Sequence, residues 1–364
     1  MYGAGYNSLF LSDKLPIPAM VNFVELGIAD YQKFIKISTA KGLDLSLHLA
    51  RTPITERDNT QDMFVQYIHS EFFSGVISNN QIKSIGIHLI GERQDDIGKF
   101  GFSSNFVPSL RSEKQAIRFI KTMSSVTHLP TWIENANFYS NSIEEILTTW
   151  KTIANICQES NAGLIVDLSH LLIDAKNNDL DPLILLGSVP WQFLSEIHLS
   201  GLIQACNGSW HDGHSESVHK NVWDLLDICL GCLIKHDKDL VVTIEHTSPA
   251  WAMHQDTYTH DFLQLQSYIS KNREMPSSKS NDSLGYATSY LKKLLKQRLP
   301  DLTNIMENKK INFNEVFDLW IKSVSQQNKR IVMTIEEVPP QERNSVTVAV
   351  EGFSNFIDQV VLKC

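Results

Sequence analysis

The sequence predicts a parallel (β/α)8 barrel, or TIM barrel, followed by a small α+β appendage. Short apolar or alternating runs recur through residues 2–246, and amphipathic helical stretches separate them. Such an alternation over roughly 250 residues is typical of this barrel. A doubly wound open sheet is less favoured, because the turn after the first run reads GAGYNS. That turn lacks the glycine-rich pattern that binds a phosphate.

The predicted strands are short and rich in aliphatic residues, as strands buried on both faces are. Each ends near a polar residue or a turn signal. In chain order they cover residues 2–7, 21–27, 43–50, 82–91, 130–136, 163–169, 194–201 and 239–246.

The predicted helices lie between these strands and carry apolar residues at intervals of three and four. One of them has an N-cap signal, because Asn141 and Ser142 precede two acids in NSIEEIL. The clearest helical stretches are 62–77, 112–126, 143–160, 219–236 and the closing segment 256–270.

The domain organisation follows from a change of composition after the closing helix. Residues 1–270 form the predicted barrel, and residues 271–283 are polar, serine-rich and read as a linker. Residues 284–364 contain two helix-like and two strand-like stretches. They are predicted to form an appendage that binds a peptide or a partner.

The composition disfavours two kinds of partner. The 364 residues carry a net charge of −9, which argues against a nucleic-acid-binding surface. No uncharged apolar run approaches the ~20 residues that span a bilayer. Residues 1–20 lack the basic and apolar regions of a secretory signal. We therefore expect a cytoplasmic protein that binds neither nucleic acid nor membrane.

The five cysteines are scattered and odd in number, unlike a disulfide framework. Cys229 and Cys232 form a C-x-x-C motif, the spacing of a zinc or redox pair. The residues around them are apolar with helical spacing, and no second such motif completes a zinc site. We therefore favour two buried helix cysteines with reduced thiols.

A barrel places its chemistry at the carboxyl ends of its strands, and here those ends are rich in histidine and acid. Any one such residue alone would indicate an ordinary core or rim position. Every predicted strand from the third to the eighth supplies at least one, and buried imidazoles and carboxylates are costly unless something satisfies them. This residue set suits zinc, iron or manganese, and its size indicates two or three ions with bridging carboxylates. The nine predicted ligands are His48, His88, Glu134, Asp167, His170, His198, Asp212, His214 and Glu245.

The remaining histidines are assigned by their surroundings. His219, at the end of WHDGHSESVH, is predicted to begin a helix, and Glu216 in the same stretch is predicted to be solvated. His211, His246 and His254 lie close enough in sequence to contact a ligand residue or a substrate. Ordinary surface positions are expected for His69, His128, His236 and His260.

Five segments resemble, in their order, the multinuclear non-heme iron-dependent oxidative enzymes (MNIO). The methanobactin-biosynthesis oxidase and the thiaglutamate-pathway oxidase are members of this family. The segments are IENANFYSN, GLIVDLSHLLIDAKN, EIHLSG, DGHSESVHKNVWDL and VTIEH. They are short individually and specific together, and the resemblance covers about residues 2–270.

The resemblance implies a barrel in which the nine residues hold two or three iron ions of mixed Fe(II)/Fe(III) state. It implies an oxidoreductase that uses dioxygen to modify a residue, often cysteine, of a ribosomally made precursor peptide in natural-product (RiPP) biosynthesis. A partner protein or fused domain commonly presents the peptide. Two positions depart from the family pattern. His170 stands where many members carry Asn, and IEHTSPAW lacks an expected Arg-Asp pair after its glutamate.

Three other functions remain open. Trinuclear-zinc apurinic endonucleases share the Asp-x-x-His and Asp-x-His spacings, but LIQACNGSWHDGHSES and TSPAWAMHQD contain no Lys or Arg to hold phosphates. A sugar isomerase or epimerase with one or two ions needs fewer ligands. A non-catalytic scaffold would be expected to have lost ligands, and none is lost.

Overall fold

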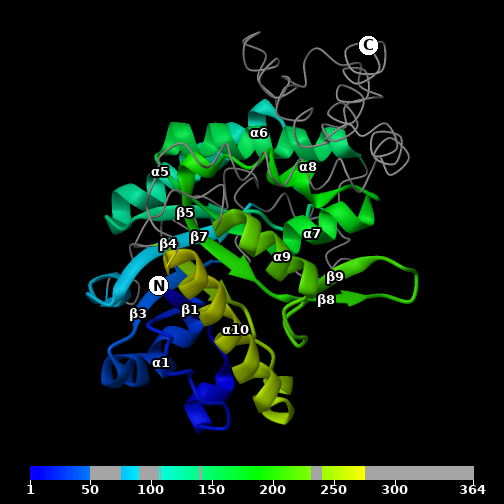
Figure 1. Ribbon diagram of the computed structural model, residues 1–364. Coiled ribbons are helices and arrows are strands. Elements are labelled where there is room, and N and C mark those ends of the chain that lie inside the picture. The colour runs from blue at the N-terminus through cyan, green and yellow to red at the C-terminus, as the bar shows by residue number, and fades with distance from the viewer. Residues whose placement is uncertain (50–74, 90–105, 107, 139–141, 231–239, 275–364) are drawn as a thin grey trace, which may run out of the picture. The chain divides into compact units, whose positions relative to one another are not determined.

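A closed barrel of eight parallel strands confirms the predicted fold class (Figure 1). The computed structural model describes residues 1–49, 75–89, 106, 108–138, 142–230 and 240–274, and the statements below concern these residues. Around the barrel the strands run β1-β10-β7-β6-β5-β4-β3-β2. Their bounds are β1 Tyr2–Gly5, β2 Phe23–Leu26, β3 Asp44–His48, β4 Ile82–His88, β5 Thr131–Glu134, β6 Gly163–Asp167, β7 Leu194–Leu199 and β10 Val241–Ile244.

Helices begin where the sequence supplies caps. The Ser142 side chain accepts the N–H of Glu145 at the predicted start of α6, and Ser109 and Ser112 form a capping box on α5. Apart from 75–77, the helix predicted at 62–77 lies outside the described residues. The helices are α1 Ile28–Lys41, α5 Leu110–Thr127, α6 Ile143–Ser160, α7 Leu168–Asn177, α8 Pro182–Leu186, α9 Lys220–Ile228 and α10 Gln255–Glu274. Short 3-10 turns occupy Ser8–Ser12, Trp191–Phe193 and Pro249–Met253.

The strands alternate between an apolar face and a polar face that lines the barrel interior. Glu25 on β2 lies 3.4 Å from His198 on β7, and these strands are not neighbours, so the contact crosses the interior. Lower in the barrel, the Trp132 indole N–H donates to Ser46 and Ser84. Because side chains of a strand alternate, the aliphatic residues between these polar ones face the surrounding helices.

A two-stranded antiparallel hairpin follows β7 and projects from the barrel (Figure 1). It consists of β8 Gly201–Gln204 and β9 Trp210–Gly213. No strand was predicted at 202–213, and the structure corrects this. The Asn207-Gly208 pair marks the turn, where Gly208 has a φ of +87°. Asn177 of α7 closes the outer edge of β9, because its amide bonds both the N–H and the carbonyl of Trp210.

The described residues belong to one compact unit, residues 1–230 with 234–275. Helix α10 continues to Glu274, four residues into the predicted linker that begins at 271. The predicted appendage, residues 284–364, lies outside the described residues. No described helix is both long and apolar enough to cross a membrane.

Candidate metal centre

The structure brings the nine predicted ligands to one end of the barrel. Five are the last or next-to-last residues of β3 to β7, and Glu245 directly follows β10. His170 lies in the first turn of α7, which starts at the end of β6, and Asp212 and His214 come from the hairpin and the residue after it. They fall into three adjoining groups, of which the first two share Glu134.

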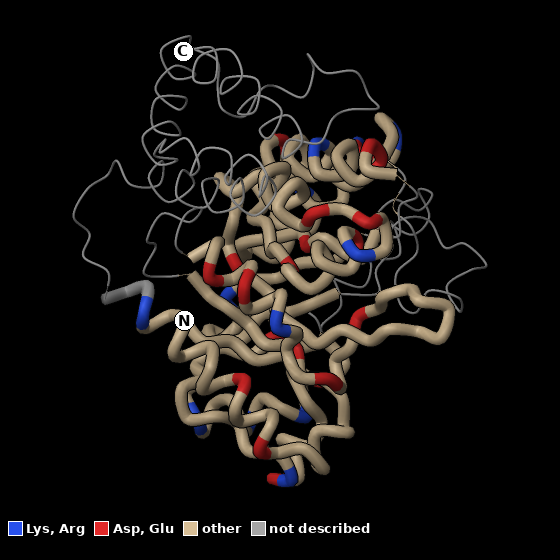
Figure 2. The backbone as a smooth tube through the Cα atoms, turned by 45° about the vertical axis from the view of Figure 1, so that its right-hand side comes forward, with Lys and Arg blue, Asp and Glu red and all other residues tan. Residues whose placement is uncertain are grey.

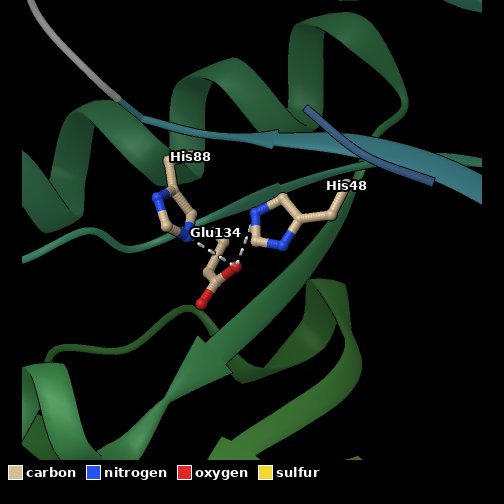
Figure 3. Close-up of side chains that lie close together, drawn as sticks. All are labelled: His48, His88 and Glu134. Carbon is tan, nitrogen blue, oxygen red and sulfur yellow. Dashed lines mark ion pairs between the residues drawn. The ribbon is translucent and has the colours of Figure 1, made fainter. Parts of the chain in front are cut away.

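The first group joins β3, β4 and β5. Figure 3 shows the rings of His48 and His88 pointing at the carboxylate of Glu134. Their Nε2 atoms lie 3.4 Å and 3.1 Å from Glu134 Oε2. All three atoms are buried and make no hydrogen bond. Two ring nitrogens and a carboxylate oxygen therefore converge on one point.

The second group lies deeper, and Glu134 connects it to the first. Ligand atoms of Glu134, Asp167, His198 and Glu245 all lie within 4.8 Å of one another, and all four residues are buried. His198 Nδ1 is 3.2 Å from Glu134 Oε1 and 3.6 Å from Glu245 Oε1. The two carboxylate oxygens of Asp167 have different surroundings. Oδ1 caps α7 by accepting from the N–H groups of Ser169 and His170, while buried Oδ2 makes no hydrogen bond.

The third group is more open and connects the hairpin to α7. Asp212 Oδ2 lies 2.6 Å from His214 Nε2 and 3.5 Å from His170 Nε2. Ser200 donates to the other Asp212 oxygen at 2.7 Å, which fixes the carboxylate. His214 Nε2 also lies 3.5 Å from Glu245 Oε2, so this group adjoins the second.

Two buried carboxylates of the site escaped the sequence analysis. Glu25 of β2 lies 2.6 Å from His48 Nδ1, and Glu196 of β7 lies 3.2 Å from His198 Nε2. Both belong to groups whose ligand atoms lie within 4.8 Å of one another. The two-residue alternation would have found Glu196, because it shares a face with His198.

The site is strongly acidic. Six carboxylates surround five imidazoles, and no ion pair of the described residues joins any of the six to Lys or Arg. Figure 2 shows the described Lys and Arg as separate short segments, not as one continuous run. When the imidazoles are neutral, the six carboxylates carry a negative charge that bound cations would balance. The six are Glu25, Glu134, Asp167, Glu196, Asp212 and Glu245.

The close packing shifts the pKa values of these groups in the metal-free protein. Burial disfavours protonation of His48 and His214, but Glu25 and Asp212 outweigh it and raise each pKa to about 9. Burial raises the pKa of Glu245 to about 8. Burial also acts to raise the pKa of Glu134, yet the imidazoles of His198 and His88 hold it well below its usual range.

The donor set fits bound metal ions. Buried polar atoms normally find hydrogen-bond partners, yet ligand atoms from five residues here have none although they face one another. Imidazole with carboxylate is the ligand chemistry of zinc, iron and manganese. The unpartnered atoms are His48 Nε2, His88 Nε2, Glu134 Oε2, Asp167 Oδ2 and His214 Nε2.

The other histidines lie away from these groups. Buried His246 directs Nε2 at Asp261, 2.8 Å away, and His211 bonds Ser209 within the hairpin. His219 caps α9, as predicted for a residue that begins a helix. Surface positions are confirmed for His128 and His260, and His254 is also exposed, while His69 and His236 lie outside the described residues.

The C-x-x-C motif is described only in part. Cys229 is buried at the end of α9, as expected for a helix cysteine, and Cys232 lies outside the described residues. Cys157 and Cys206 are free thiols.

Residues 106–263 match the sequence model of a family described as the RiPP precursor modification enzyme MbnB/TglH/ChrH. This match includes seven of the nine candidate ligands and both hairpin strands, and it confirms the resemblance predicted from the sequence. The chain is thus similar, over this segment, to a class of peptide-modifying barrel enzymes.

Individual relatives extend the comparison. A UPF0276 protein of Haemophilus influenzae is 25% identical over 268 residues, which are 62% of this chain and 82% of the relative. One of Shewanella sediminis is 23% identical over 113 residues, 31% of this chain and only 40% of the relative's length. Among solved structures, D-psicose 3-epimerase of Clostridium cellulolyticum H10 has 11% identity and a TM-score of 0.46. That match covers 75% of this chain and 98% of the epimerase chain.

Proposed function

We propose that this chain is a di- or tri-iron oxidase that uses dioxygen to modify a residue, cysteine in the first instance, of a ribosomally made precursor peptide. The observation that carries the proposal is the convergence of unpartnered, buried imidazole and carboxylate atoms on one end of the barrel. The family match at residues 106–263 supports a peptide as substrate. We further propose that the enzyme acts in the cytoplasm and that residues 284–364 or a partner protein present the peptide.

The three groups indicate which residues would hold which ion. His48, His88 and Glu134 would hold one, and Glu134 with Asp167, His198 and Glu245 would hold the second. His170, Asp212 and His214 would hold a third. Glu134, with one oxygen toward each of the first two groups, is suited to bridge them.

Bound iron would supply the redox chemistry, with dioxygen as electron acceptor and the peptide residue as electron donor. The protein supplies fixed positions for the ions. Asn135 accepts from His170 at its carbonyl, and its side chain bonds the main chain of Asp167. Two ligand-bearing strand ends are thereby held by one residue. Burial of the second group keeps bulk water from its carboxylates.

The third group is the proposed substrate side of the centre. The His214 side chain is 32% exposed and Asp212 is 23% exposed, whereas Glu134 and His198 are fully buried. We therefore propose that a peptide approaches the centre from the hairpin side. The hairpin would then lie beside the entering peptide.

The test is metal analysis of full-length protein purified without oxygen, followed by reaction with dioxygen and the precursor peptide encoded beside its gene. We expect two or three irons per chain and a changed peptide mass. Glu134→Gln is expected to lose at least one iron and all turnover. Glu159→Gln, on the exposed face of α6, is the matched control and should retain both.

Two results would contradict the proposal. Stoichiometric zinc with cleavage of abasic DNA would instead identify a hydrolase of the same barrel class. Unchanged iron content in Glu134→Gln would show that the ions lie elsewhere.

A further inference from the structure

Two carboxylates lie beneath the proposed ligands, deeper in the barrel. Glu25 and Glu196 are 3% and 4% exposed; Glu25 is the next-to-last residue of β2, and Glu196 lies in the middle of β7. A buried carboxylate is costly unless charge and hydrogen bonds compensate it. Both face ring nitrogens of proposed ligands: Glu25 faces His48 and Glu196 faces His198.

Glu25 determines which nitrogen of His48 can bind an ion. The two groups approach to 2.6 Å, and since the carboxylate of Glu25 accepts, His48 Nδ1 must donate. The remaining nitrogen, Nε2, then carries the lone pair. It is the unpartnered nitrogen that faces Glu134 and His88.

His198 presents Nδ1 to the centre, whereas the other rings present Nε2. His170 donates Nδ1–H to the carbonyl of Asn135, and His214 has Nδ1 on the Thr247 hydroxyl, so each presents Nε2 to the centre. His198 Nε2 instead faces Glu196 at 3.2 Å and Glu25 at 3.4 Å.

Glu196 is itself held in place. Thr243 on the neighbouring strand β10 donates its hydroxyl to Glu196 Oε1. The strand register pairs Thr243 with His198, so the Thr243 hydroxyl lies beside the imidazole that Glu196 also contacts. Gly3 on β1 leaves the room for this contact, because a Cβ there would meet the Thr243 hydroxyl.

We infer that Glu25 and Glu196 are positioning residues that keep the protons on His48 Nδ1 and His198 Nε2. They thereby direct His48 Nε2 and His198 Nδ1 at the bound ions. A carboxylate behind a metal-binding histidine fixes the tautomer and the ring orientation. The inference rests on the proposed metal centre and is independent of iron, dioxygen and peptide.

The first test uses the full-length chain loaded with zinc, which is diamagnetic, and ¹⁵N-labelled histidine. Nitrogen chemical shifts identify the protonated and the metal-bound nitrogen of each ring. We expect His198 to bind through Nδ1 with Nε2 protonated, and His48 to bind through Nε2. Zinc on His198 Nε2, or on His48 Nδ1, would overturn the inference.

The second test measures zinc affinity by competition with a chromophoric chelator. Glu196→Ala and Glu25→Ala are expected to weaken binding about 10- to 100-fold. Glu196→Gln keeps an acceptor oxygen at the same place and should lose less. The matched control is Asp261→Asn, another buried carboxylate, which contacts Ser217, Val218 and His246 but no proposed ligand.

The outcomes are distinguishable. If Glu196→Ala and Glu25→Ala bind zinc within about twofold of wild type, or if Asp261→Asn loses as much as they do, the positioning role is wrong and the metal centre stands. If the wild-type chain binds no cation, both the proposed metal centre and this inference are wrong. Thermal unfolding of each variant in its metal-free form identifies any loss that comes from misfolding.

Discussion

At the scale of single residues, three imidazoles of the candidate centre each make a hydrogen bond through Nδ1, the ring nitrogen that faces away from the centre. Their three partners are the Glu25 carboxylate, the Asn135 carbonyl and the Thr247 hydroxyl. Each bond leaves one ring nitrogen directed at neighbouring carboxylates. The ring orientation is therefore set before any ion binds, which lowers the entropy cost of binding.

The raised pKa values make cation binding depend on pH. In the metal-free protein the pKa of His48 and of His214 is about 9 and that of Glu245 is about 8, so these groups hold protons at neutral pH. A cation must displace them. Since these pKa values are raised, binding strengthens as pH rises and levels off above about 9. We expect about a tenfold gain in zinc affinity per pH unit between about 6 and 8.

This dependence is measured by zinc competition across that range and by calorimetry in buffers of different ionisation enthalpy. Calorimetry should show protons released on binding. An affinity that does not vary with pH, with no proton release, would mean that the bound ions do not contact these groups.

At the scale of elements, strand β4 shows how the barrel makes room for the site. Gly86 lies two residues before His88, and a Cβ at Gly86 would meet the ring and the carbonyl of Trp132. That ring packs edge-on against His48 at 5.1 Å between centroids. Because Gly86 has no side chain, the Trp132 indole can pack against His48.

Gly86→Ala is expected to destabilise the fold by ~1–3 kcal/mol, because the extra carbon overpacks the β4–β5 contact. It should also weaken zinc binding through displacement of Trp132 and His48. Gly187→Ala, at the exposed C-cap of α8, is the control, since a Cβ there meets its nearest atoms at 3.5 Å. Thermal unfolding and zinc competition report the two effects. Equal stability of the two variants would contradict this account of the β4–β5 packing.

At the scale of the whole molecule, closure of the barrel is what assembles the centre. Glu25 on β2 and His198 on β7 are 173 residues apart in the chain and meet only because the sheet closes. The hairpin after β7 then adds Asp212 beside α7. The described unit thus contains all nine predicted ligands.

Deletion of residues 284–364 is expected to leave the number of bound ions unchanged. Binding of the precursor peptide should weaken at least tenfold, because we propose that this segment presents it. Elemental analysis and fluorescence anisotropy with a labelled peptide measure the two quantities. Unfolding of the truncated chain would show that the segment is part of the barrel unit, and undiminished peptide binding would refute the presenting role.

The sequence by itself determined the barrel and the end at which its polar residues gather. Strand and helix periods are local, so all eight strands and α6 could be predicted close to their observed bounds. The ligand candidates could also be predicted, because the carboxyl ends of parallel strands lie at the same end of the barrel.

Only the tertiary structure decided the hairpin and the inner carboxylates. The sequence prediction assigned no strand to 202–213. The Asn207-Gly208 turn is a local signal for the pairing of β8 with β9, but the side-chain bonds from Asn177 that hold β9 join residues far apart in the chain. Glu25 looked like an ordinary strand residue, since nothing near it in sequence is a histidine. Its partner His48 lies on the neighbouring strand β3, and its partner His198 lies across the barrel on β7. Such contacts depend on strand order and register, which local patterns do not encode.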